Sequence, residues 1–217
     1  MCTILLQWFV RQSRKRKMVQ WLDGKTWLDI TREERNFCAD LYLEIRDHPK
    51  EFVRFINECH VCSKNASGKS LNETENWEVA YEMAYYRDLR HSNKAKGHEA
   101  EGNKQRKFDL ALISDRQLVI VEAKAQGGFS SDDIKKYKKD LADIRESRED
   151  QDVSVFLVLL CSSRWFCSKN RKVETKDVAD YVITWKDLAG NSSIVCSKSK
   201  SSFCRAEKVY GDKPASA

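Results

Sequence analysis

The segment KFDLALISDRQLVIVEAK, residues Lys107–Lys124, decides the fold class of this 217-residue chain. Its apolar residues alternate with their neighbours as they do in strands, at Phe108, Leu110, Leu112, Leu118 and Ile120. The run LVIV that starts at Leu118 is apolar on both faces, which is typical of a central strand covered on both sides. Between the two halves, Ser114–Gln117 is polar and predicts a tight turn. We therefore expect two strands, joined by a turn, inside a sheet.

Three charged residues interrupt this apolar pattern. Asp109 lies in the first strand, and Glu122 and Lys124 lie at the end of the second. Residues two apart in a strand point to the same face, so Glu122 and Lys124 share one face and Ala123 points to the other. The turn folds the chain back, which can bring Asp109 alongside them. Buried charges are costly unless they are paired or bind a metal, so the alternatives are a salt-bridged strand end and a metal site.

The pattern has a direct chemical interpretation. Two carboxylates supply the hard oxygen ligands that Mg²⁺ prefers, and the Ala123 carbonyl can add another. Lys124 can orient or deprotonate an attacking water, or offset charge in a transition state. A bound metal polarises a phosphoryl oxygen and lowers the pKa of its water.

The arrangement of Asp109, twelve intervening residues, and then Glu122-Ala123-Lys124 resembles the PD-(D/E)xK nuclease superfamily. Phe108 stands where the superfamily's name has proline, a substitution that the superfamily tolerates. The resemblance implies an α/β protein, a restriction-endonuclease-like sandwich with a central mixed β-sheet flanked by helices. It also implies a Mg²⁺-dependent deoxyribonuclease, with Mn²⁺ as a substitute. In that enzyme Asp109, Glu122 and the Ala123 carbonyl would bind the metal, and Lys124 would handle the water.

The function that this resemblance favours is an endonuclease of restriction or defence type that acts on DNA. Many such nucleases dimerise to cut both strands, so a homodimer is an expected assembly. Two alternatives come from other classes. One is a catalytically inactive nucleic-acid-binding module of the same fold. The other is a zinc-stabilised interaction protein built on Cys59 and Cys62, although a second pair of zinc ligands with suitable spacing is missing.

The segment from about Asn72 to Arg90 predicts a long buried helix, because apolar residues cover nearly its whole circumference. Glu78 and Glu82 lie one turn apart on one stripe of this helix. The superfamily often carries an acidic residue on its first core helix, close to the metal site. Glu78 and Glu82 are the candidates for that assisting role, and the sequence leaves the choice between them open. The alternative is that both pair with basic side chains or face solvent.

Other segments predict the remaining core elements. An amphipathic helix begins at Asp132 and ends at about Ser147, with Tyr137 in its apolar stripe. Strands follow at 152–160 and 181–184, and a helical turn after them is ended by a glycine. One strand of the expected core is missing from this series, and we place it in the polar stretch 90–107.

Four regions follow from these patterns. We expect an N-terminal arm over 1–25, a helical extension over 26–70, a nuclease-like core over 71–190 and a C-terminal tail over 191–217. The tail is rich in Ser and Lys and reads as an appendage.

Composition bounds the class of protein. Apolar residues make up 41% of the chain, with six Trp and nine Phe, which is typical of a globular protein. The net charge of +6 is compatible with a polyanionic partner without requiring one. No apolar stretch approaches a membrane span and no secretory signal is recognisable, so we expect a cytoplasmic protein with reduced thiols and no membrane partner.

Overall fold

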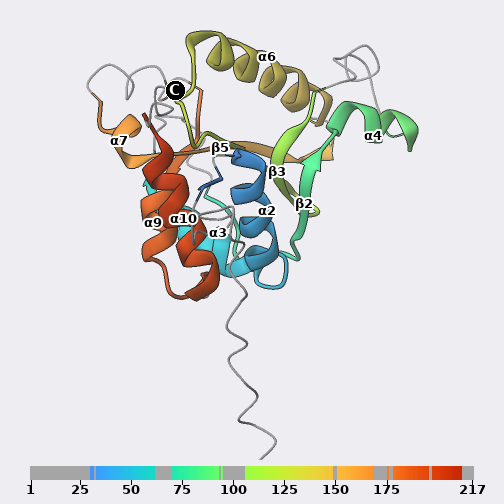
Figure 1. Cartoon of the computed structure of the whole chain (residues 1–217). Coiled ribbons are helices and arrows are strands. Elements are labelled where there is room, and N and C mark those ends of the chain that lie inside the picture. The colour runs from blue at the N-terminus through green and yellow to red at the C-terminus, as the bar shows by residue number, and fades with distance from the viewer. Residues whose placement is uncertain are drawn as a thin grey trace, which may run out of the picture. The chain divides into compact units, whose positions relative to one another are not determined.

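The chain forms a mixed β-sheet with helices on both faces (Figure 1). The structure is a computed structural model that describes residues 30–31, 33–61, 70–92, 94, 106–148, 151–168, 175, 178–195 and 197–211. The chain divides into two units, Met1–Thr31 and Arg32–Ala217, and the sheet belongs to the second. The expected arm over 1–25 lies outside the described residues.

Six strands form the sheet in the order β1-β6-β5-β4-β3-β2. Their bounds are β1 His60–Val61, β2 Glu78–Met83, β3 Phe108–Ile113, β4 Gln117–Ala123, β5 Ser154–Cys161 and β6 Tyr181–Thr184. Strands β2, β3 and β4 are antiparallel neighbours, β4, β5 and β6 run parallel, and β1 is antiparallel to β6. The prediction of an α/β protein with a mixed sheet flanked by helices is confirmed.

The β3–β4 hairpin forms as predicted. Every residue of β4 is buried, as expected for an apolar run covered on both faces. The turn is closed by the Ser114 amide, which donates to the Gln117 carbonyl at 2.9 Å, and by the Ser114 hydroxyl, which accepts from the Gln117 amide at 3.0 Å. The start of β3 therefore lies beside the end of β4, at the end of the hairpin away from the turn.

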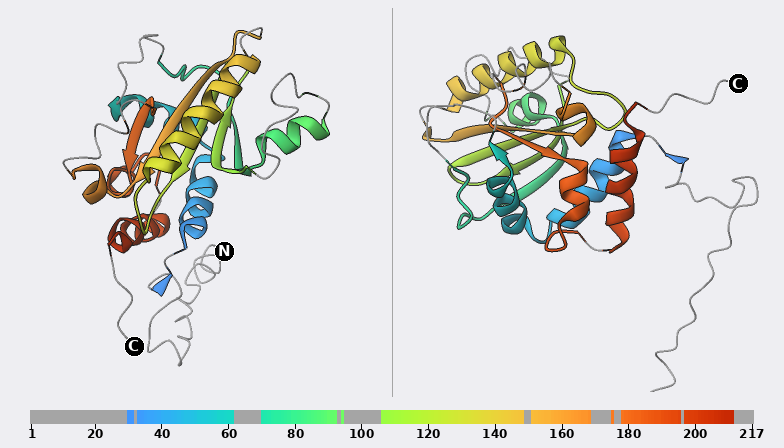
Figure 2. Two further views of the ribbon diagram at one scale, coloured as in Figure 1. Left: turned by 90° about the horizontal axis from the view of Figure 1, so that it is seen from above. Right: turned by 90° about the vertical axis from the view of Figure 1, so that its left-hand side faces the viewer.

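Helices cover the two faces of the sheet unequally, as two views at right angles show (Figure 2). One face is covered by α2 Glu34–Ile45, α3 Pro49–Glu58, α9 Trp185–Gly190 and α10 Ser197–Val209. The other face is covered by α4 Tyr85–His91, α6 Ser131–Arg148 and the short α7 Ser163–Phe166. Each layer has its own apolar core against the sheet. Helices α2 and α3 pack on the sheet itself and share its core.

The prediction of a long helix between Asn72 and Arg90 is wrong. Residues Glu78–Met83 form strand β2, and the chain enters a helix only at Tyr85. The segment pairs with β3 in register, with Tyr81 opposite Leu110. An edge strand that is half-buried on both faces carries apolar residues at nearly every position, which a helical projection reads as an apolar circumference. Strand β2 is also the strand that was expected within 90–107.

The C-terminal tail is not an appendage. Helix α10 places Phe203, Ala206 and Val209 in the same core as α2 and α9, each with no exposed side-chain surface. These residues are spaced by three, so they line one face of a helix. The Ser and Lys residues between them dominate the composition and hid this apolar face. Ile194 and Val195 are buried without forming a strand.

Candidate functional site

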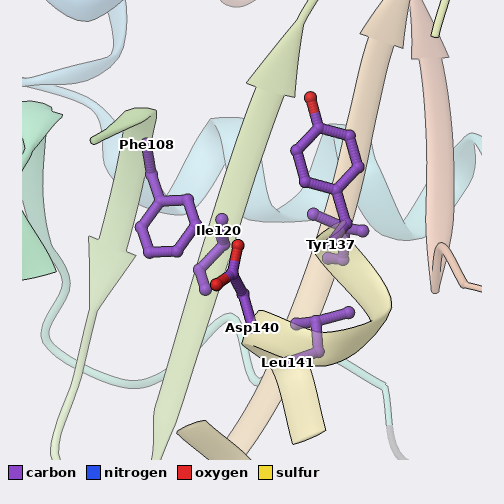
Figure 3. Close-up of a pocket in the computed structure, with 6 residues that line it drawn as sticks. Phe108, Ile120, Tyr137, Asp140 and Leu141 are labelled. Carbon is purple, nitrogen blue, oxygen red and sulfur yellow. The ribbon is translucent and has the colours of Figure 1, made fainter. Parts of the chain in front are cut away.

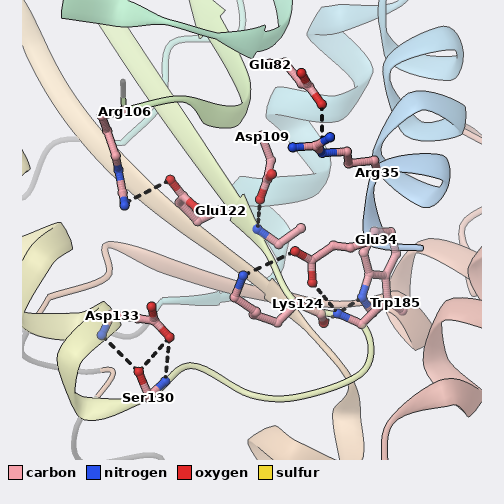
Figure 4. Close-up of polar contacts among 12 residues, drawn as sticks. Glu34, Arg35, Glu82, Arg106, Asp109, Glu122, Lys124, Ser130, Asp133 and Trp185 are labelled. Atoms are coloured by element: carbon pink, nitrogen blue, oxygen red, sulfur yellow. Dashed lines mark hydrogen bonds and ion pairs between the residues drawn. The ribbon is translucent and has the colours of Figure 1, made fainter. Parts of the chain in front are cut away.

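The sheet brings Asp109 and Glu122 together where β3 begins and β4 ends. Leu110 pairs with Val121, which places Asp109 and Glu122 at the next opposed positions. The Asp109 side chain accepts a hydrogen bond from the Ala123 amide at 2.8 Å (Figure 4). The Asp109 carboxylate thus accepts the hydrogen bond that the backbone carbonyl of a neighbouring strand would otherwise accept. This hydrogen bond fixes the Asp109 side chain at the end of β4, next to Glu122.

Glu122 is an acid in an apolar setting. Its side chain lies on the α6 face of the sheet, and the residue is 5% exposed. Its pKa is raised to about 8, mainly by burial and also by the nearby Asp109, although Arg106, Lys124 and a hydrogen bond from Tyr137 offset part of this effect. Burial also raises the pKa of Asp109. The two acids therefore sit in a site that favours a neutralising cation.

Lys124 follows the last residue of β4 and pairs with an acid from another element. Its Nζ lies 3.2 Å from Oε1 of Glu34. The Lys124 backbone is fixed on both sides, because its amide donates to the Leu160 carbonyl and its carbonyl accepts from the Trp185 indole. Burial alone would lower the pKa of Lys124, but Glu34, Asp109 and Glu122 raise it overall. Lys124 is therefore protonated at neutral pH.

Glu34 is the site residue that the sequence analysis missed. It opens α2, and its Oε2 accepts the Ala125 amide at 2.9 Å while Oε1 contacts Lys124. Burial raises its pKa, with Asp109 adding to the shift. The sequence held one signal: Glu34 stands four residues before Cys38 and so extends the apolar stripe of α2 by one turn.

Glu82 lies beside this cluster but is already paired. Its carboxylate contacts Arg35 and Lys107, each at 3.2 Å, and it contributes to the raised pKa of Asp109. The backbone of Glu82 has a φ of 47°, a conformation that non-glycine residues rarely adopt. This bend interrupts the register of β2 and β3 opposite Asp109.

Glu78 does not belong to the site. It pairs with Ile113, at the end of β3 next to the turn, and its side chain is exposed. The expectation that Glu78 assists the acids fails because a strand of six residues separates its two ends, whereas the expected helix would have placed Glu78 and Glu82 one turn apart.

Asp109 and Glu122 are suited to one cation by chemistry and by electrostatics. Mg²⁺ needs only one or two carboxylates, since water and phosphate complete its shell. Across the described ranges, no group of three or more acidic, His or Cys side chains is gathered in a metal-binding arrangement. Among the described residues, the ligands offered at this place are therefore the two carboxylates. Ala123 lies between the two positions, with its amide bound to Asp109.

Comparison with known proteins identifies no relative. No family model matches the chain. No curated protein and no solved structure matches it either. The functional argument therefore depends on the site itself.

The structure gives limited information on the zinc alternative and on membrane spans. Cys59 is a free thiol, and Cys62 lies outside the described residues, so the zinc alternative is untested. No helix in the described part of the chain is long and apolar enough to cross a membrane.

An apolar gap between α6 and the sheet, lined by Phe108 and Tyr137 among others, has no room for a water molecule (Figure 3). This gap is therefore packing space and not a substrate site.

Proposed function

We propose that this protein is a Mg²⁺-dependent phosphodiesterase that cleaves DNA, an endonuclease of restriction or defence type with a restriction-endonuclease-like fold. The observation that carries the proposal is the cluster of Asp109, Glu122, Lys124 and Glu34 at one end of the β3–β4 hairpin. Raised pKa values of buried acids beside a charged partner are characteristic of functional sites. A homodimer that cuts both strands is the assembly that this proposal favours.

The order of the elements supports the fold assignment. Helices α2 and α3 precede the antiparallel strands β2, β3 and β4, then α6 follows, and β5 pairs parallel to β4. A restriction-endonuclease-like core has the same order of a helix, three strands, a helix and a strand, and α4 is an addition between the first two strands. In this alignment Glu34 occupies the place of the acidic residue on the first core helix.

The chain's own residues have distinct roles in the proposed reaction. Asp109 and Glu122 would hold the metal, with the Ala123 carbonyl as a further oxygen on the same strand end. Bound Mg²⁺ would polarise the scissile phosphate and acidify a water. Because Lys124 is protonated, it offsets negative charge that develops on the phosphate and does not remove a proton. Glu34 can accept the water's proton, since burial makes it a better base than an exposed glutamate.

Nicking of supercoiled plasmid with Mg²⁺ or Mn²⁺ tests this function. We expect cleavage by wild type and its loss in Lys124→Ala, by roughly 10² to 10⁴ in rate, with folding retained. Asp109→Ala should also lose cleavage, but through weaker metal binding, so raised Mg²⁺ should restore part of it. Glu78→Ala removes an acid from the far end of β2 and is the matched control with wild-type activity.

Two results would count against the proposal. The first is a wild-type protein that cuts neither duplex DNA, single-stranded DNA nor RNA under these conditions. The second is a Lys124→Ala variant that cuts as fast as wild type, which would show that the site residues are misassigned.

A second candidate, an inactive nucleic-acid-binding module, is favoured by one observation. Each acid of the cluster already has a partner within the chain: Asp109 binds an amide, Glu122 contacts Arg106, and Glu34 contacts Lys124. Acids that are neutralised within the chain in this way do not need a metal ion. Binding of DNA by wild type without cleavage in either Mg²⁺ or Mn²⁺ would favour the module.

A further inference from the structure

Arg106 is a half-buried arginine just before β3 that no part of the sequence pattern had marked. Its side chain is 20% exposed. Its NH2 group donates to Glu122 at 3.3 Å, and its Nε lies 3.1 Å from Asp140 on α6. It therefore bridges a candidate metal ligand and an acid on the neighbouring helix.

Aromatic rings hold this guanidinium in place. Its central carbon lies 4.9 Å from the ring centre of Tyr137 and 5.4 Å from that of Phe108. Asp140 is itself anchored, because it accepts a hydrogen bond from the Tyr86 hydroxyl at 3.4 Å. The apolar gap that these rings line is too small for water, so the rings are closely packed. Arg106 is thus preorganised on the α6 side of the acid cluster.

The hydrogen-bonding capacity of Arg106 is not used up by these contacts. Although Nε is close to Asp140, its N–H is not aligned with that oxygen, and it has no hydrogen bond to any residue in the described ranges. A guanidinium has five N–H donors in a planar fork. Nε itself is shielded from solvent and faces Asp140, and NH2 contacts Glu122, so the N–H groups of NH1, which have no hydrogen bond to a described residue, are the ones left for a ligand oxygen.

We propose that Arg106 binds a non-bridging oxygen of the scissile phosphate in the nuclease reaction. This inference rests on the proposed function. When Glu122 is committed to a metal, Asp140 and the two rings still hold Arg106, and its fork then faces an anion beside that metal. Phosphate is the oxyanion that matches this fork, and the contact would add positive charge where the transition state gathers negative charge. Asp140 is then a positioning residue.

The competing role is simple neutralisation, in which Arg106 occupies the place of the metal. The two roles predict opposite effects of removing it. A neutralising arginine competes with the metal, so Arg106→Ala would bind Mn²⁺ more tightly and would gain activity. A phosphate-binding arginine is needed for the reaction, so Arg106→Ala would lose activity although Mn²⁺ binds at least as tightly as before.

The experiment uses the full chain and three variants, Arg106→Ala, Arg106→Lys and the control Arg116→Ala, which removes an exposed arginine at the hairpin turn. Mn²⁺ affinity is measured by calorimetry. Affinity for a fluorescent duplex is measured with Ca²⁺ in place of Mg²⁺ over a salt series, and nicking is measured with Mg²⁺. Thermal melts verify that each variant is folded.

We expect Arg106→Ala to bind the duplex roughly 10-fold more weakly, with a salt slope reduced by about 1, and to cut at least about 10²-fold more slowly. Arg106→Lys keeps the charge but loses the fork, and should fall between it and wild type. If Arg106→Lys is folded and Arg106→Ala is not, the loss of DNA affinity and cleavage rate in Arg106→Lys relative to Arg116→Ala decides whether Arg106 binds phosphate.

The outcomes separate this inference from the proposed function. Wild-type cleavage with undiminished binding and cutting in the Arg106 variants overturns the phosphate role and leaves the nuclease intact. Binding without cleavage overturns the nuclease, and the binding deficit of the variants then still decides whether Arg106 contacts phosphate. A wild-type protein that neither binds nor cuts nucleic acid overturns both.

Discussion

At the scale of single residues, the site is a balance of buried charge. Four ionisable side chains and Arg106 lie at the end of one hairpin, and burial is the first cause of the raised pKa of each of the three acids, Glu34, Asp109 and Glu122. A protein interior tolerates such a group of acids only with cations beside it. The chain supplies Lys124 and Arg106, and Mg²⁺ is the cation that the proposed function adds.

The pKa of Glu122 leads to a prediction about metal-free protein. Its pKa is about 8 when folded and near the ordinary value of 4.5 when unfolded, so the folded state holds the proton more tightly. Stability from this group is complete below about 4.5 and is lost as the pH rises through 8. Glu122→Gln keeps an acceptor for Arg106 but cannot ionise, and should therefore melt a few degrees higher than wild type at pH 9 in EDTA.

The measurement is a thermal melt at several pH values in EDTA. For a domain of this size, 1 kcal/mol corresponds to roughly 2–4 °C. The melting temperatures of wild type and Glu122→Gln should converge near pH 5, where Glu122 is largely protonated. Parallel curves across this range would show that Glu122 ionises normally in the folded protein.

At the scale of elements, two helices cap each other. Glu207 on α10 accepts from the Ser163 amide at 3.0 Å and from the Ser163 hydroxyl at 2.6 Å, which satisfies the start of α7. In return, Arg164 on α7 donates to the carbonyls of Lys208 and Tyr210, at 2.8 and 2.6 Å, where α10 ends. The loop after β5 and the C-terminal helix are therefore locked together by paired end caps.

Loss of one cap should weaken this lock. Glu207→Ala removes the acceptor for the start of α7 and should lower the free energy of unfolding by about 1–2 kcal/mol. Chemical denaturation followed by circular dichroism provides the measurement. Glu146→Ala, which removes an exposed acid on α6, is the control and should change stability by less than about 0.5 kcal/mol. Equal stability of the two variants would contradict the capping role.

At the scale of the whole second unit, segments from both ends of the chain complete one core. Helices α2 and α3 near the start and α9 and α10 near the end cover the same face of the sheet. Phe37 on α2 and Phe203 on α10 both contact Trp185, with ring centres 6.0 and 5.9 Å apart. The core that packs next to Lys124 and Glu34 thus depends on residues far apart in sequence.

Phe203→Ala tests whether α10 is part of this core. The side chain is fully buried, so its truncation should cost about 3–5 kcal/mol, whereas an appended tail would tolerate it. Leu43→Ala, at a side chain that is 54% exposed, is the matched control and should cost much less. Urea unfolding curves of the two variants measure the difference. A loss below about 1 kcal/mol for Phe203→Ala would return α10 to the status of an appendage.

What the sequence determined by itself was local. Alternation and the turn at Ser114 predicted the β3–β4 hairpin, and the same hairpin placed Asp109 beside Glu122, because strand register is set by the residues within the pair. Tertiary structure decided the rest. The segment that became β2 is a strand because β3 offers it an edge, an interaction that no helical projection includes. Glu34 meets Lys124 across 90 residues, and Arg106 meets Asp140 across the sheet face, because packing and not sequence spacing brings these charges together.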